Sequence, residues 1–202
     1  MSIINTGFGR KREPVDPTRV PPGQFLVTDW PVLTYGPTPQ VDTAKWSFKI
    51  EGLVEQEMEW NWEQMQALTQ STMNTDIHCV TRWSKLNTTW TGVSLDELFK
   101  LTKPKPEAKY VVAYCDGGYT TNLPLADVLN GQAMVAFNFD NQPLAAQHGG
   151  PARLFVPHLY LWKSAKWVRG LQLLARDAPG FWEVNGYNNH GDPWKEERYS
   201  GD

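Results

Sequence analysis

The segment DIHCVTRWS, residues 76–84, contains one of the two cysteines of this 202-residue chain, set among a histidine, an arginine and a tryptophan. The residues STMNTDIHCV predict a strand over 71–80 that runs into a loop. Cys79 therefore lies where a predicted strand meets a predicted loop. Its thiol could serve packing, a disulfide, nucleophilic catalysis or a metal.

The residues alone leave several roles for Cys79 open. A lone cysteine is most often a buried packing residue. As a zinc ligand it would lack a CxxC or HxxxH partner motif, and the adjacent His78 would point to the opposite face of a strand. It could instead be the single protein thiolate on a metal whose other ligands belong to a cofactor, with Arg82 nearby to favour the charged form. As a nucleophile it would need a base, for which three downstream histidines are candidates: His148, His158 and His190.

Composition limits the function classes. Apolar residues make up 41% of the chain, and the length suits one domain with a single core. The net charge of −3 gives no overall basicity that would point to nucleic acid. Ten tryptophans favour a lined cleft about as well as a tryptophan-rich core.

Targeting signals are not recognisable in this sequence. No apolar run is long enough for a membrane span, and the basic N-terminal residues are not followed by the apolar stretch of a secretory or twin-arginine signal. We therefore expect a cytoplasmic protein with reduced thiols, in which a disulfide between Cys79 and Cys115 is disfavoured. Cys115, in the apolar run VVAYCDG, is predicted to be a buried strand thiol.

The predicted fold class is α+β, in a single mixed α/β domain, because short helices alternate irregularly with strands. Prolines predict an extended N-terminal arm over residues 1–24, and residues 25–202 form the domain. A short strand is expected at FLV, 25–27. Helices are predicted at 60–68, 94–101 and 125–130, with Asn61 capping the first, a Ser94–Glu97 capping box on the second, and Pro124 and Gly131 bounding the third. Further strands are predicted at 45–52, 109–118, 133–139, 152–158 and 166–175.

One interval of the chain is conspicuously basic. Between Asp140 and Asp177 there is no acidic residue, although much of the interval is apolar. An anionic cofactor or substrate would explain this pattern, and scattered surface cations on strands would explain it equally well. No Walker motif or GxGxxG is present, so a nucleotide is not specifically indicated. The cations and histidines of the interval are His148, Arg153, His158, Lys163, Lys166, Arg169 and Arg176.

Five segments, taken together in order and spacing, resemble the sulfite-oxidase family of molybdopterin-dependent oxidoreductases. They are HCVTRWS, WTGVSLDELF, YTTNLPLADVL, NQPLAAQHGGPARLFVP and KSAKWVRGLQL, and the resemblance runs from about Phe25 to the end of the chain. It implies the molybdopterin-binding fold of that family. It also implies a cofactor of one molybdenum atom per chain on plain molybdopterin, with Cys79 as the thiolate ligand of the metal.

The same resemblance implies which residues hold the cofactor. In the family, an HGxPxR segment and a segment ending in lysine line the pterin, and the first corresponds here to His148 and Arg153. An arm with an Arg-Asn-His triplet also contacts the cofactor in the family, and the corresponding positions here are Thr28, Asp29 and Trp30, which keep none of the three residue types. The remaining cofactor-binding positions implied are His78, Cys79, Thr28, Asp29, Trp30, Asp116, Ser164, Ala165 and Lys166.

For substrate binding, the resemblance implies catalytic roles for Tyr119 and Arg82, which would orient a substrate oxygen beside Cys79. Two positions that hold sulfite-binding arginines in the family are Thr28 here and, near the C-terminus, Val184 or Asn185. A neutral S-oxide or N-oxide therefore fits a tryptophan-lined pocket better than sulfite does.

The expected function is two-electron oxygen-atom transfer at molybdenum, on a small oxide and with an unidentified electron-transfer partner, without nucleic acid or membrane. The alternative is a non-redox module that binds a small anion in the same basic aromatic cleft. A zinc or thiol hydrolase is a further alternative.

Overall fold

A computed structural model of the chain describes residues 16–202. The predicted arm over residues 1–24 lies partly outside the described residues. Within residues 16–24 the chain makes turns at 17–19 and 22–23 and does not run extended throughout, and Val20 is buried.

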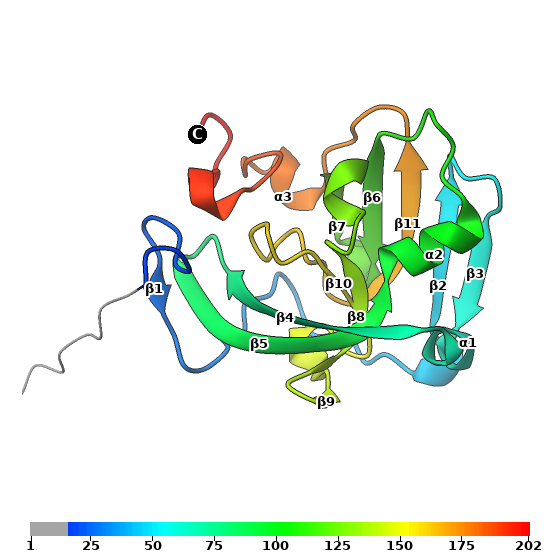
Figure 1. Ribbon diagram of the computed structural model, residues 1–202, viewed down its shortest axis with the longest axis horizontal. Helices are drawn as coiled ribbons and strands as arrows, with labels where there is room; N and C mark the ends of the chain where they lie inside the picture. The colour runs from blue at the N-terminus through cyan, green and yellow to red at the C-terminus, as the bar shows by residue number, and fades with distance from the viewer. Residues whose placement is uncertain (1–15) are drawn as a thin grey trace, which may run out of the picture.

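Two β-sheets form the body of the α+β domain (Figure 1). The first sheet has the order β1-β5-β8-β10, with β4 also paired to β5 and β9 to β8; the second has the order β3-β2-β11-β6-β7. The main core cluster takes residues from both sheets, including Val93 and Leu154 from the first and Phe48 and Val111 from the second. The strands of the first sheet are β1 (Phe25–Leu26), β4 (Gln70–His78), β5 (Trp83–Ser94), β8 (Met134–Phe139), β9 (Gln142–Pro143) and β10 (Arg153–Phe155), and those of the second are β2 (Ser47–Gly52), β3 (Met58–Asn61), β6 (Tyr110–Cys115), β7 (Thr120–Pro124) and β11 (Val168–Leu174).

Alternating apolar residues explain β2, as predicted. Trp46, Phe48 and Ile50 point into the core and are at most 1% exposed. The predicted strand over 166–175 begins later, at Val168, because Trp167 has a left-handed backbone with φ of 53° that no strand tolerates.

Two of the three predicted helices are confirmed. In α1 (Trp62–Ala67), the Asn61 side chain and the Gln64 side chain form a reciprocal capping box. In α2 (Leu95–Thr102), the backbone N–H of Glu97 donates to the Ser94 hydroxyl at 3.2 Å.

The third predicted helix, over residues 125–130, is wrong. The segment makes only one 3₁₀ turn, Leu125–Val128, and Pro124 belongs to the preceding strand. The Asp96 carboxylate accepts hydrogen bonds from the backbone N–H groups of Asn130 and Gly131, at 2.9 and 2.6 Å. These bonds to α2 replace the intrahelical bonds that a longer helix would need.

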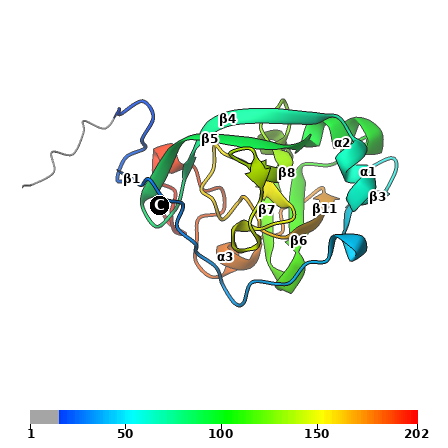
Figure 2. The same cartoon turned by 90° about the horizontal axis from the view of Figure 1, so that it is seen from below.

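The β4–β5 hairpin carries the cysteine loop, and its second strand is longer than the sequence indicates. No element is predicted for residues 85–93, yet β5 extends through them and pairs with both β4 and β8. Seen from below, β4 and β5 run along one side of the molecule, and β1 lies at one end of them (Figure 2).

Residues 175–202, here called the C-terminal wrap, follow β11 and contain a short helix α3 (Phe181–Val184) and a 3₁₀ turn at Pro193–Lys195. Three further 3₁₀ turns occur at Thr43–Lys45, Asp116–Gly118 and Ala146–His148. Within residues 16–202, no helix has the length and apolar character required to cross a membrane.

Candidate functional site

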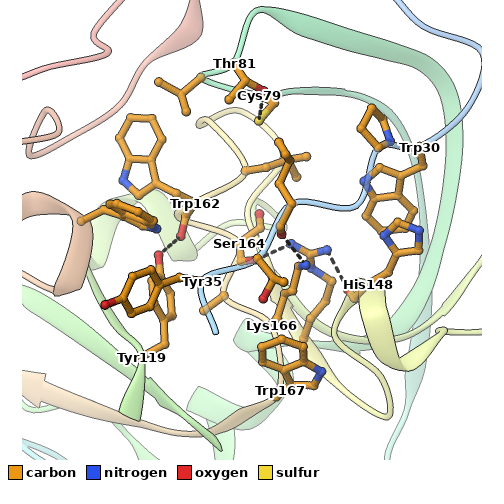
Figure 3. A pocket seen from close by; sticks show the side chains of 18 of the residues that line it. Trp30, Tyr35, Cys79, Thr81, Tyr119, His148, Trp162, Ser164, Lys166 and Trp167 are labelled. Carbon is orange, nitrogen blue, oxygen red and sulfur yellow. Dashed lines mark hydrogen bonds between the residues drawn. The ribbon is translucent and has the colours of Figure 1, made fainter. Parts of the chain in front are cut away.

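A cavity of about 300 Å³ opens beside the cysteine loop (Figure 3). Its wall is formed by the loop after β4, the irregular segment 30–35, the segment 161–167 and residues of the C-terminal wrap. It brings together eight residues implied by the sequence: Trp30, Cys79, Tyr119, His148, Arg153, Ser164, Ala165 and Lys166.

Cys79 begins the four-residue turn between β4 and β5. Its backbone N–H donates to the Trp83 carbonyl at 2.9 Å, and its carbonyl accepts from the Arg82 N–H at 3.0 Å. The Thr81 hydroxyl donates to Sγ at 3.2 Å. Burial raises the pKa of the thiol, and the hydrogen bonds from Thr81 oppose this. A thiol in this setting becomes a thiolate readily only when a metal ion takes the place of its proton.

The cavity that Cys79 lines also carries a buried cation. Arg153 is 2% exposed, and it donates to the carbonyls of His148, at 2.9 Å, and of Ser164. Its Nε atom is buried without a hydrogen-bond partner. Burial lowers the pKa of Arg153 to about 10, so the guanidinium still carries its charge at neutral pH.

Lys166 and His148 flank Arg153. The Lys166 amine donates to the carbonyls of Leu33, at 2.6 Å, and Gln147, at 2.8 Å. Burial, and then the Arg153 charge, lower the pKa of Lys166 to about 8 and that of His148 to about 4. The His148 ring stacks on Trp30 with 3.8 Å between centroids and 9° between planes. At neutral pH the cluster therefore holds two positive charges and a neutral imidazole.

This cluster lacks a counter-ion. Among residues 16–202, neither Arg153 nor Lys166 forms an ion pair with a carboxylate. A buried charge is costly unless it is paired, so the site fits a ligand that supplies its own anion. The phosphate of a pterin cofactor meets this requirement, and Cys79 on the same cavity wall supplies one soft metal ligand.

The zinc and nucleophile interpretations of Cys79 find no partner residues. In the described part of the chain, no group of three or more His, Cys, Asp or Glu side chains could hold a metal ion. The Thr81 hydroxyl, and no histidine, hydrogen-bonds to Sγ within residues 16–202. A metal at this thiol therefore needs ligands that do not come from the protein.

Aromatic side chains form the rest of the wall. The Tyr119 hydroxyl donates to the Trp162 carbonyl at 2.6 Å, and burial raises the pKa of this phenol well above its ordinary value. The Trp162 indole N–H in turn donates to the Glu183 carboxylate at 2.9 Å. Glu183 pairs at 2.6 Å with Lys163, a fully buried lysine of the basic interval.

Five residues implied by the sequence do not line the cavity. Thr28 and Asp29 are exposed on the segment that leads to Trp30, and Arg82 is exposed with φ of 72°. The His78 ring is buried and hydrogen-bonds to the Ser84 hydroxyl at 2.8 Å. Asp116 forms an ion pair with Arg169 at 2.8 Å. Their roles at the site stay predictions.

Two cations of the basic interval are neutralised by acids far along the chain, because Lys163 pairs with Glu183 and Arg169 with Asp116. The free positive charge at the site is therefore smaller than the sequence suggests. Cavity residues that sequence reasoning does not single out include Tyr35, Thr81, Trp162, Trp167, Trp182 and Tyr187. The high tryptophan content points to the three tryptophans among them.

Comparisons with known proteins agree with this geometry. A family model described as "Oxidoreductase molybdopterin binding domain" matches residues 35–182. The "Uncharacterized oxidoreductase YuiH" of Bacillus subtilis is 42% identical over 196 residues, which are 96% of this chain and 99% of that protein. The "Putative protein-methionine-sulfoxide reductase subunit YedZ1" of Azospira oryzae is 31% identical over 75% of this chain and 58% of its own length.

A solved structure supports the fold. The sulfane dehydrogenase SoxCD from Paracoccus pantotrophus superposes with a TM-score of 0.63, at 23% identity, over 69% of this chain and 40% of the SoxCD chain. At this level of identity, the likeness concerns the fold.

Proposed function

The chain belongs to the family of oxidoreductases with a molybdopterin-binding domain, and from this premise we propose that it transfers oxygen atoms to or from a small neutral S-oxide or N-oxide. As a molybdopterin-dependent oxidoreductase it uses the molybdenum–molybdopterin cofactor. Family membership argues against the alternative of a non-redox anion-binding module.

The observation that carries the proposal is the placement of the Cys79 thiol and the unpaired Arg153 on one cavity wall. Cys79 would supply one thiolate to the metal. Arg153 and Lys166 would hold the anionic end of the pterin, since both are cationic at neutral pH and neither has an acidic partner among residues 16–202.

The charges left for a substrate favour a neutral one. Arg153 and Lys166 are the lysine and arginine side chains that line the cavity within residues 16–202, and the cofactor would occupy both. Arg82 is exposed and lies outside the cavity wall. A dianion such as sulfite would therefore find no further cation, whereas a neutral oxide suits the aromatic wall. The name of the Azospira oryzae relative, a putative reductase of protein methionine sulfoxide, is in keeping with an S-oxide.

When bound, the cofactor supplies two-electron exchange coupled to transfer of one oxygen atom; in the reducing direction an S-oxide with two electrons and two protons yields a sulfide and water. The chain's own residues would bind and orient the oxide substrate and would exclude water from it. Trp30, Trp162 and Trp182 supply apolar wall that would keep bulk water from the bound oxide.

Tyr119 would act as a hydrogen-bond donor and not as a base. Its raised pKa keeps the phenol protonated at neutral pH. The proton points at the Trp162 carbonyl, so donation to a substrate oxygen requires the hydroxyl to turn away from that carbonyl.

The test is metal and pterin analysis of freshly purified protein from a host that makes the cofactor, followed by two assays: turnover of a panel of S-oxides and N-oxides with an artificial reductant, and oxidation of sulfite with an artificial electron acceptor. We expect about one molybdenum per chain and turnover of the neutral oxides above that of sulfite. Protein with zinc or without any metal would contradict the cofactor assignment, and preferential sulfite oxidation would contradict the substrate class.

A further inference from the structure

Two segments from opposite ends of the chain meet at the cysteine turn. The first is the residue before β1, Gln24, whose side-chain amide donates to the carbonyls of Cys79, at 3.1 Å, and Trp83, at 3.0 Å, and to the Ser84 hydroxyl at 3.3 Å. The next backbone N–H, of Phe25, donates to the Arg82 carbonyl at 2.8 Å. In Figures 1 and 2, β1 and the C-terminal segment lie at the same end of the molecule.

The second segment contributes Arg198. Its guanidinium donates to the Val80 carbonyl at 2.8 Å and to the Gln24 side-chain oxygen at 3.1 Å, with a longer contact to the Pro22 carbonyl at 3.4 Å. The side chain is 4% exposed, and Glu196 lies 3.6 Å away as a half-exposed partner. The guanidinium also lies over the Tyr160 ring, 5.0 Å from its centroid.

These contacts hold the backbone of the turn from outside. Within the turn itself, the backbone bonds are those between Cys79 and Arg82 and between Cys79 and Trp83. Thr81 and Arg82 are exposed, and Arg82 adopts a left-handed conformation that a non-glycine residue seldom takes. A short exposed turn with this strain keeps one geometry only when its surroundings enforce it. Gln24 and Arg198 provide that enforcement.

The aromatic ring under Arg198, that of Tyr160, in turn packs against the cavity wall. Tyr160 stacks on Trp162 with 5.4 Å between ring centroids and 20° between planes, and Trp162 lines the cavity. Arg198 therefore touches the cysteine turn directly and is connected to the cavity wall through Tyr160, which packs on Trp162. Gln24 and Arg198 both lie outside residues 35–182, the part of the chain that the family model matches.

We propose that Gln24 and Arg198 are positioning residues that clamp the Cys79 turn between the two ends of the chain and so set the direction in which Sγ meets the metal. This inference rests on the proposed role of Cys79 as the molybdenum ligand. The charged, forked Arg198 side chain suits the role because it donates to two acceptors at once, whereas a lysine would satisfy one at a time.

The experiment compares the holoenzyme with Arg198→Gln, Arg198→Lys and Gln24→Ala. The matched control is Lys195→Gln, which removes a cation from the same segment at a side chain that is 65% exposed. Two readouts are used: amide hydrogen exchange of the peptide that covers the turn, and the electron paramagnetic resonance spectrum of the Mo(V) state. The spectrum reports the geometry of the metal–sulfur bond, which a loss of global stability alone would not change.

For Arg198→Gln we expect turn amides that exchange about tenfold faster or more, a changed Mo(V) spectrum and a molybdenum content within about twofold of the parent. Gln24→Ala should do the same, Arg198→Lys should recover part of the loss, and Lys195→Gln should match the parent. If Arg198→Gln does not fold, Gln24→Ala carries the test. Parent-like exchange and spectra in the variants would overturn the inference. A parent protein without molybdenum would overturn the proposed function instead, while the exchange rates would still decide whether the two residues hold the turn.

Discussion

The hydroxyl of Tyr119 donates a 2.6 Å hydrogen bond to the main-chain carbonyl of Trp162, which joins the start of β7 to the aromatic wall of the cavity. Tyr119→Phe removes this bond and leaves a carbonyl without its donor. We expect a loss of about 1–2 kcal/mol in the free energy of unfolding, measured by denaturant titration. If the hydroxyl also orients the substrate oxygen, kcat falls further, by about 10²-fold.

The control for this variant is Tyr199→Phe, at a side chain that is 53% exposed. It should leave both quantities unchanged. Parent-like stability of Tyr119→Phe would show that the hydrogen bond contributes nothing, and a parent-like kcat would remove Tyr119 from the proposed catalytic residues.

The buried pair of Lys163 and Glu183 supports the same wall. Glu183→Gln leaves the fully buried Lys163 ammonium without its counter-charge, and removal of one member of such a pair costs about 3–5 kcal/mol. The comparison is Glu97→Gln, which breaks an exposed pair with Lys100 at 3.5 Å and should cost at most about 1 kcal/mol. Equal losses for the two variants, measured by denaturant unfolding, would contradict this account.

Arg153 should matter more to the loaded protein than to the empty one. Arg153→Gln removes the buried cation that would hold the cofactor's anionic end, so we expect pterin content to fall by about tenfold or more. Without cofactor, Arg153 is a buried charge with no acidic partner among residues 16–202, so its removal relieves that charge while it loses the bonds to the His148 and Ser164 carbonyls. The two effects oppose each other, and the empty protein should lose no more than about 2 kcal/mol of stability. Exposed Arg176→Gln is the control. Undiminished pterin content in Arg153→Gln would contradict the assignment.

A histidine bridge ties the C-terminal wrap to the 3₁₀ turn after β7. His190 hydrogen-bonds to Asp127 at 3.0 Å and to Glu197 at 2.9 Å. These bonds raise the pKa of His190 above its ordinary value of 6.5, and the bond with Asp127 has the larger effect. A raised histidine pKa stabilises the fold fully below about pH 6.5, and the stabilisation disappears as pH rises through the folded-state value. Because His190 is 35% exposed, the effect should stay below about 1 kcal/mol.

The measurement is denaturant unfolding of the parent and His190→Gln between about pH 5.5 and 8.5. Burial lowers the pKa of His78 and of His148 to about 4, and both therefore oppose the trend at the acid end. They are present in both proteins and cancel in the difference. A stability difference that does not shrink with rising pH would refute the bridge.

The local sequence is sufficient to predict those elements whose stabilising contacts come from residues a few positions away in the chain. The Asn61 and Ser94 caps and the alternation in β2 depend on residues a few positions apart, and they are found in the structure. The predicted helix after Pro124 was wrong because Asp96, about 30 residues earlier, binds its last backbone N–H groups.

The cavity was predictable where short motifs contain its residues. Cys79, Arg153 and Lys166 each lie in such a segment, and the fold brings them to one wall. Two other contacts depend on how separate segments pack: the ion pair of Lys163 with Glu183, and the hydrogen bond of Arg198 with Gln24. No local sequence pattern predicts either contact.

Molybdenum K-edge X-ray absorption of the holoenzyme and of Cys79→Ser tests the central claim most directly, because it counts the sulfur atoms bound to the metal. With Cys79 as a ligand beside two pterin sulfurs, we expect about three sulfur neighbours in the parent and about two in the variant, with pterin retained. The Cys115→Ser protein should keep the parent count, since burial raises the pKa of that thiol and it does not line the cavity. An unchanged sulfur count in Cys79→Ser would contradict the account.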